Sequence, residues 1–103
     1  MRKAFIYVEG MRAATFTMHN IQSFELVYED NYEGRPISLT YPVKKKKFVF
    51  NQFPTFFEGL LPEGIMLETL LQRSKIDRHD YYSQLMVVGS DLVGNVTVVE
   101  IAL

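Results

Sequence analysis

The run Phe53-Pro54-Thr55-Phe56-Phe57-Glu58-Gly59-Leu60-Leu61-Pro62-Glu63-Gly64 is the stretch that decides the fold of this chain. Pro54 suits the first turn of a helix, where its missing N–H costs nothing. Gly59 and the Leu61-Pro62 pair predict that this helix is short, because the residue before a proline is pushed out of the α region. Large apolar side chains recur at i, i+3, i+4 and i+7, the spacing of one buried helical face: Phe53, Phe56, Phe57 and Leu60.

This run predicts a corner between two helices that seals the hydrophobic core, with the second helix beginning at Gly64. It also has a functional interpretation that is compatible with the first. Pro62-Glu63-Gly64 would hold the next two side chains, Ile65 and Met66, at a rigid and exposed helix start. The second helix has an apolar stripe of Met66, Leu67, Leu70 and Leu71. Core packing is therefore an equal alternative for Met66, whereas Ile65 lies off that stripe.

The size of the chain predicts one domain, residues 1–103, because 103 residues is near the commonest domain size. A chain this long buries more than about 60% of the surface that its unfolded form exposes. With 48% hydrophobic residues, a core is feasible without covalent links. The absence of cysteine excludes a disulfide scaffold, a thiol nucleophile and every cysteine-based zinc site, and it suits a reducing compartment.

Charge is unevenly spread along the chain, although the formal net charge is only −1. Lys44–Lys47, the lysine run, holds four of the eleven basic residues, which leaves seven basic against twelve acidic residues elsewhere. A mildly acidic body with one basic tip is not the broad basic face of a nucleic-acid-binding protein.

No apolar run approaches the roughly 20 residues that a membrane-spanning helix needs. The N-terminal stretch is basic at Arg2 and Lys3, but its apolar segment ends at Glu9, too early for a secretory signal peptide. We therefore expect a cytoplasmic protein with no membrane contact.

Most of the first half of the chain is predicted to be extended. Lys3–Val8 and Ala14–Met18 read as a hairpin around Glu9-Gly10, because both runs are rich in residues that favour strands. Ser23–Tyr28 alternates apolar and polar positions and predicts a third strand, with its aromatic and leucine side chains on one face. Pro36–Tyr41 is expected to be a short edge strand, or a strand that leaves the sheet early, because prolines stand at both ends.

The second half predicts helices and then a last strand. Asp77 is expected to cap a third helix, with Asp80 three residues later in the manner of a capping box, and Gly89 marks its end. Leu92–Ile101 is rich in β-branched residues and predicts the final strand. The fold class is therefore α+β, a small antiparallel β-sheet or open barrel with two to three helices packed at one face or end.

Asp77-Arg78-His79-Asp80 resembles a scrambled kinase catalytic loop. The order His-Arg-Asp is not present, however, and the fifth residue after Asp80 is Leu85 instead of asparagine. Gly89 and Gly94 match neither phosphate-loop pattern. Helix capping explains the two aspartates, so we exclude catalysis by this motif.

The other candidate catalytic or metal-binding residues also lack partners. His19 and His79 are the two histidines, and neither has a partner at metal-ligand spacing. Ser90 lacks the strand-to-helix elbow of a serine hydrolase. Glu58 and Glu63 are better explained as helix-end charges than as an acid–base pair. We expect no enzyme activity, no metal and no cofactor.

The lysine run has two interpretations. Four lysines on one loop could hold phosphates, but only with weak, salt-dependent and sequence-blind affinity. Alternatively, they form a solvated loop that discourages edge-to-edge pairing of sheets. The acidic rest of the surface favours the second interpretation.

Five segments stand in a recognisable order: the strand pair around Glu9-Gly10, Phe24–Tyr28, Arg35–Pro42, Phe56–Gly64 and Gly89–Val98. Together they resemble the N-terminal subdomain of HipA-type serine/threonine kinases, the toxins of bacterial toxin–antitoxin modules. The resemblance covers nearly the whole chain. The sequence stops where the kinase body of that family begins, so the resemblance implies no ATP-binding or catalytic residue.

A free-standing version of this subdomain is similar to the HipS-type antitoxins of tripartite HipBST modules. The resemblance implies an antitoxin that binds a HipT-like or HipA-like serine/threonine kinase toxin and inhibits it by protein–protein contact. It also implies a third, helix-turn-helix protein of the HipB type, which supplies DNA binding in a ternary complex. A kinase subdomain separated from its body is the other interpretation of the same resemblance.

An inhibitor of this kind needs a rigid scaffold with an apolar anchor and a polar rim. We predict that Ile65 and Met66, held by Pro62, Glu63 and Gly64, form the anchor. Methionine is adaptable at such surfaces, and isoleucine brings no polar group that needs a partner.

A second candidate patch is formed by Tyr81 and Tyr82 at the start of the third helix. Two rival functions remain open at this point. A nucleic-acid-binding accessory module would require the Lys44–Lys47 loop to dominate, and a small-molecule enzyme would require a polar cleft with perturbed titratable groups.

Overall fold

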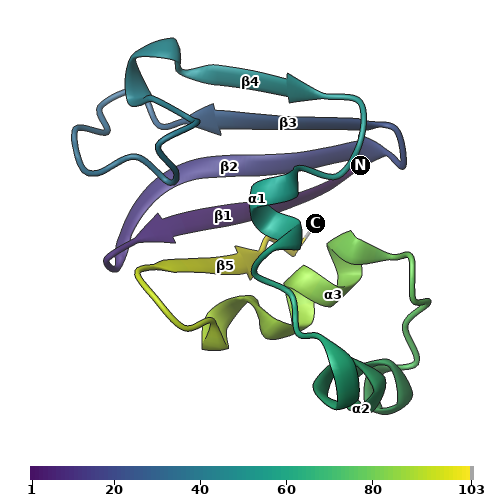
Figure 1. The fold of residues 1–103 in the computed structure, drawn as a ribbon. Coiled ribbons are helices and arrows are strands. Elements are labelled where there is room, and N and C mark those ends of the chain that lie inside the picture. The colour runs from purple at the N-terminus through teal and green to yellow at the C-terminus, as the bar shows by residue number, and fades with distance from the viewer. Residues whose placement is uncertain (103) are drawn as a thin grey trace.

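The computed structural model describes residues 1–102 and is built on a five-stranded antiparallel sheet, which Figure 1 shows as a ribbon. The spatial order of its strands is β4-β3-β2-β1-β5, so β4 and β5 form the two edges and the sheet does not close into a barrel. The predicted α+β class is confirmed. The strands are β1 (Arg2–Val8), β2 (Met11–Asn20), β3 (Ser23–Tyr28), β4 (Lys47–Phe50) and β5 (Val96–Glu100).

The hairpin between β1 and β2 is confirmed, and its turn explains why. Glu9 and Gly10 have φ angles of +51° and +81°, and Val8 pairs with Met11 across the turn. Positive φ at both central residues is the type I′ geometry, whose twist matches that of the two strands. β2 is longer at both ends than the sequence predicted. A bulge between Ile6 and Tyr7 in the pairing lets Ala13 face the core as well.

The strand β3 matches its predicted bounds and its predicted face. Phe24, Leu26 and Tyr28 are all buried, as the alternation indicated. The strand that pairs with its outer side is β4, which contains Lys47 at the end of the lysine run.

Pro36–Tyr41, expected as an edge strand, is a loop, and that prediction is wrong. The hydroxyl of Tyr28 explains the loop, because it binds main-chain groups that a strand would offer to a neighbour. It accepts from the Ile37 N–H at 2.9 Å and donates to the Tyr41 carbonyl at 2.5 Å. The loop is therefore fastened to the sheet by a side chain, and the edge position is left to β4.

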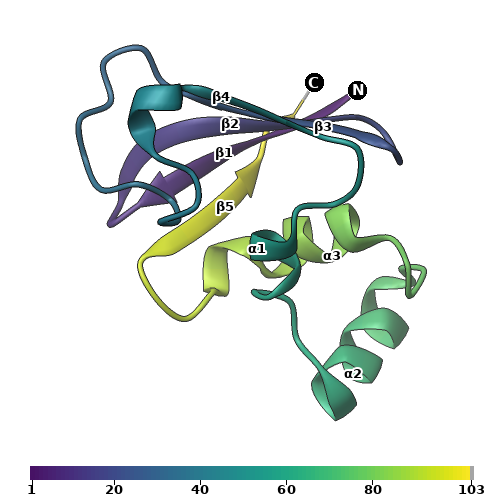
Figure 2. The same ribbon diagram turned by 45° about the horizontal axis from the view of Figure 1, so that its top comes forward.

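The helical elements are η1 (Val43–Lys45), α1 (Thr55–Glu58), α2 (Gly64–Ser74), α3 (Tyr81–Val88) and η2 (Gly89–Asp91). Figure 2 shows α1 and α3 on one side of the sheet, with α2 farther from it. None of the helices within residues 1–102 is long and apolar enough to cross a membrane.

The predicted corner is confirmed as a seal of the core. Pro54 caps the single turn α1, and Phe57 is fully buried, with its ring stacked on Phe16 of β2 at a centroid distance of 4.5 Å. Phe53 is buried too, and its ring meets that of Phe16 edge-on at 6.0 Å. The helix ends at Gly59, as expected.

Two predicted boundaries are wrong by several residues. The third helix begins at Tyr81 and its cap is Asp80, whose carboxylate accepts from the Ser83 N–H at 3.1 Å. Asp77 instead closes a small turn by accepting from the His79 N–H at 2.8 Å. The last strand is shorter than predicted, because residues 92–95 form an irregular bend in which Gly94 has a φ of +114°, and β5 begins only at Val96.

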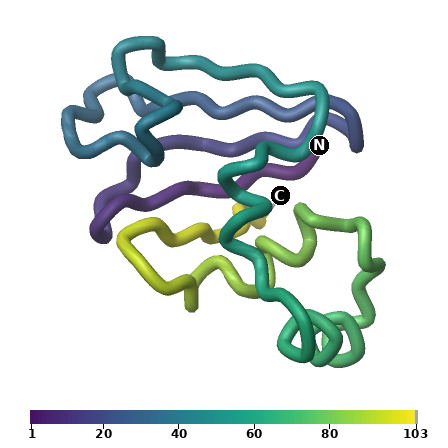
Figure 3. The backbone as a smooth tube through the Cα atoms, in the orientation of Figure 1, coloured from purple at the N-terminus to yellow at the C-terminus, as the bar shows by residue number. Residues whose placement is uncertain are grey.

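The first and last strands lie side by side and bring the ends of the chain together (Figure 3). The Ile101 N–H donates to the Lys3 carbonyl at 2.9 Å. Gly89 allows η2 to approach this strand pair, because a Cβ atom at Gly89 would lie 2.3 Å from the Val98 carbonyl oxygen.

Candidate partner-binding surface

The start of α2 is set by the backbone of Glu63 and Gly64. Glu63 is extended, with φ −128° and ψ 166°, and Gly64 has a φ of +60°. Residues that carry a side chain rarely adopt that backbone conformation. The glycine at this position therefore allows the chain to turn sharply into the helix. Pro62 precedes the pair and is half-buried. Its ring restricts the φ angle of the backbone that leads into the turn. The predicted helix start at Gly64 is confirmed.

Ile65 and Met66 stand in the first turn of α2 and point to solvent. Ile65 is 84% exposed and Met66 is 73% exposed. Met66 does not pack in the core, which was the alternative that its position on the apolar stripe left open. Two adjacent apolar side chains on a defined backbone are a preformed contact surface, because little conformational freedom of the chain is lost when a partner covers them.

The helix α2 is attached loosely to the rest of the molecule, and none of its described residues is buried. Leu67, Leu70 and Leu71 are half-buried, and α2 contacts α3. An exposed ion pair between Arg78 and Glu68 ties the helix to the following loop. Both ribbon views show α2 projecting from the body (Figures 1 and 2). The predicted apolar stripe is therefore only partly covered.

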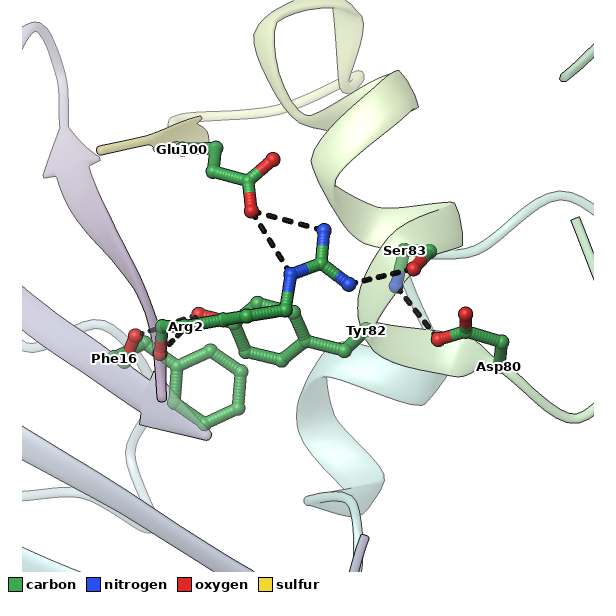
Figure 4. A network of polar contacts seen from close by, with 6 residues as sticks. All are labelled: Arg2, Phe16, Asp80, Tyr82, Ser83 and Glu100. Atoms are coloured by element: carbon green, nitrogen blue, oxygen red, sulfur yellow. Dashed lines mark hydrogen bonds and ion pairs between the residues drawn. The ribbon is translucent and has the colours of Figure 1, made fainter. Parts of the chain in front are cut away.

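The second candidate patch separates into one accessible and one inaccessible tyrosine. Tyr82 is 1% exposed and its hydroxyl donates to the Phe16 carbonyl at 2.8 Å (Figure 4). Burial raises its pKa far above the usual tyrosine value. Tyr82 is therefore a core residue, and the prediction that it lies on a contact surface is wrong. Tyr81 is half-buried, with its ring 5.7 Å from that of Phe53.

A polar network beside Tyr82 was not predicted from the sequence. Arg2 lies across the Tyr82 ring at 5.1 Å, between Glu100 and Ser83 (Figure 4). Its Nη1 donates to Ser83 Oγ at 2.6 Å, and its Nε donates to Glu100 Oε2 at 3.0 Å. Arg2 was the only feature of the sequence that could have indicated this network, but its partners Ser83 and Glu100 are 81 and 98 positions away.

The lysine run is largely engaged with the chain's own groups. Lys46 forms an ion pair with Asp30 and lowers the pKa of that carboxyl through a hydrogen bond and its charge. Lys47 Nζ lies 3.4 Å from Glu25 Oε1. Lys45 Nζ lies 5.1 Å from the centre of the Phe48 ring on β4. These contacts neutralise part of the positive charge of the lysine run. They therefore favour a loop that discourages edge-to-edge pairing of sheets over a loop that binds phosphate.

Two properties of the titratable groups in residues 1–102 bear on chemistry: how they are grouped and which of their pKa values are shifted. Histidine, aspartate and glutamate residues do not gather there in groups of three or more that could hold a metal ion. Apart from Asp30, the groups with shifted pKa values are tyrosines, whose pKa values burial raises. Asp77 and His79 face each other at 3.6 Å in an exposed turn.

The fold and this surface together define a small α+β domain with two exposed apolar side chains at the start of a projecting helix. The family model of the HipA N-terminal domain matches residues 4–99. The chain therefore belongs to the HipA N-terminal domain family.

Two relatives illustrate the match. An uncharacterised protein of Haemophilus influenzae is 28% identical over 98 residues, which cover 95% of this chain and 90% of the relative. The solved N-terminal domain of HipA toxin superposes with a TM-score of 0.78 at 20% identity, over 99% of this chain and 94% of that one. That similarity shows the shared fold. The HipA N-terminal domain is a non-catalytic subdomain, and membership relates the chain to toxin–antitoxin systems.

Proposed function

We propose that this chain is a cytoplasmic bacterial antitoxin that binds a HipT-like or HipA-like serine/threonine kinase toxin and inhibits it by protein–protein contact. The observation that carries the proposal is the exposed pair Ile65 and Met66 in the first turn of a helix with no buried side chain. Family membership supports the class of partner. The kinase surface that receives the pair would be an apolar pocket, since neither side chain offers a polar group.

The neighbouring residues complete the contact surface. Pro62 and Gly64 fix the backbone, while Glu63 is exposed and would lie on the polar rim of the contact. Tyr81 is the further candidate contact that remains accessible. A HipB-like helix-turn-helix protein would join the complex through surfaces of the kinase or of this chain, and it would supply the DNA binding.

The experiment is co-expression of this chain with a HipT-like or HipA-like kinase toxin, scored by growth and by co-purification. We expect the wild-type chain to restore growth and to purify with the kinase. Ile65→Asp should weaken binding at least about tenfold, because it removes apolar burial at the centre of the contact and buries a charge. An acidic side chain near a helix N-terminus is favourable, so this variant should keep its fold.

Val93→Asp is the matched control, because Val93 is 99% exposed in the loop before β5. It introduces the same side chain away from α2 and should leave growth rescue unchanged. Equal rescue by the wild type and by Ile65→Asp, with both folded by circular dichroism, would contradict the anchor. Failure of the wild-type chain to rescue growth or to bind the kinase would contradict the proposed function as a whole.

A further inference from the structure

A groove of about 610 Å³ opens between the β2–β3 turn and the connection from α2 to α3. The two segments lie on the same side of the molecule in Figure 1. The groove is lined mainly by apolar atoms, and its apolar side chains include Met18, Ile21, Phe24, Phe53 and Tyr81. Ile21 stands at the tip of the β2–β3 turn and is strongly exposed. The groove is therefore large enough for one or two side chains of a partner.

Two acidic side chains stand among the polar groups at the rim of this groove. Asp77 and Asp80 both line it, and the Asp77 side chain is 76% exposed. His79 lies beside Asp77, with its Nδ1 3.6 Å from the carboxylate. Arg2 is the one arginine at the groove, and its charge is already balanced by Glu100 at 2.9 Å. Of the two rim carboxylates, Asp77 has His79 beside it, and Asp80 caps α3 through the Ser83 N–H.

The two carboxylates are held in place by the local backbone. Asp80 accepts from the Ser83 N–H at the start of α3, and Asp77 accepts from the His79 N–H. Each hydrogen bond uses one carboxylate oxygen, which leaves the other free for a donor from outside. A lysine or arginine side chain is the complementary group, because it can supply several donors and the opposite charge.

We propose that this groove docks a protein segment in which a large apolar side chain stands next to lysine or arginine. The apolar side chain would lie on the floor that the packed rings of Phe24 and Phe53 form, and the basic side chain would reach Asp77 and Asp80 at the rim. Nucleic acid and other phosphate ligands do not fit, because the rim repels negative charge. The groove does not include the kinase anchor, since the Ile65 and Met66 side chains do not line it, although it shares Tyr81 with the proposed kinase contact surface.

The test uses the full chain, labelled with ¹⁵N, and three capped nonapeptides of otherwise identical glycine–serine composition. One carries Leu-Lys-Arg at its centre, one carries Leu-Glu-Glu, and one carries Ser-Lys-Arg. We expect the Leu-Lys-Arg peptide to shift amide resonances around Ile21, Phe53 and residues 77–82, with smaller or no shifts from the other two at the same millimolar concentration. Equal shifts from the acidic peptide, or from the peptide without leucine, would overturn the proposal.

Asp77→Asn with Asp80→Asn is the informative variant, because asparagine oxygens can still accept the two capping hydrogen bonds. It should weaken binding of the Leu-Lys-Arg peptide about fivefold and remove most of its salt dependence. Glu33→Gln with Asp91→Asn removes the same charge outside the groove and should change the affinity little. Unchanged binding by the first double variant, shifts confined to another face, or no shifts with any peptide would each overturn the proposal.

Discussion

Arg2 and Glu100 are 98 positions apart in sequence and form an ion pair between the first and the last strand. Arg2 Nη2 lies 2.9 Å from Glu100 Oε2, and both side chains are rather more than one third exposed. The same guanidinium also binds Ser83 at the start of α3. One side chain therefore connects β1, β5 and α3 at the place where the two ends of the chain meet.

Replacing Arg2 by Met should destabilise the protein by about 1 kcal/mol, because it removes a solvent-screened ion pair, a cation–π contact and the bond to Ser83 while keeping most of the packing. Glu100→Gln keeps an acceptor and should cost less. Urea denaturation of both variants and of the double variant measures the coupling. If the two single effects add without coupling, the pair contributes nothing to stability.

Replacing Phe57 by Ala should cost about 3–5 kcal/mol, since this ring is fully buried and stacks on Phe16. Phe56 provides the matched comparison, because it is the preceding residue of the same turn and is only half-buried. Phe56→Ala should therefore cost clearly less in urea denaturation. Equal costs would show that the corner is not organised around Phe57.

Alkaline pH should destabilise the fold through Tyr82. Burial raises the pKa of its hydroxyl in the folded state, whereas the unfolded chain has an ordinary value of about 10. The stabilising contribution is complete below about pH 10 and is lost as the pH rises above the unfolded value. The urea midpoint of the wild-type protein should therefore fall as the pH rises above about 10, and that of Tyr82→Phe should fall less steeply. At neutral pH this variant should lose about 1 kcal/mol with the hydrogen bond to Phe16. Parallel alkaline slopes for the two proteins would contradict this account.

Local patterns predicted those parts of the fold that depend on neighbouring residues. The hairpin at Glu9-Gly10, the β3 face and the start of α2 at Gly64 each follow from the conformational preferences of a few adjacent residues. The Pro36–Tyr41 prediction was wrong because the competing partner, the Tyr28 hydroxyl, is distant in sequence. The cap of α3 moved from Asp77 to Asp80 because both aspartates suit a cap, and the local pattern does not choose between them.

The candidate site was only partly predictable for a related reason. Ile65 lies off the apolar stripe of α2, so its exposure could be expected. Tyr82 reads like Tyr81 in the sequence, yet helical geometry turns one ring into the core and leaves the other at the rim. The groove near Ile21 combines segments far apart in the chain, and no single motif marks it.

The helix α2 should exchange its amide hydrogens faster than β1 and β2 in the free protein. No side chain of α2 is buried, so opening this helix exposes little apolar surface and requires less free energy than opening the sheet. Binding of the proposed kinase partner would cover Ile65 and Met66 and slow the exchange of residues 64–74. Hydrogen–deuterium exchange with mass spectrometry measures both states, and Ile65→Asp should abolish the added protection. Protection of α2 in the free chain equal to that of β2 would contradict the loose attachment, and unchanged exchange in a purified complex would place the kinase on another surface.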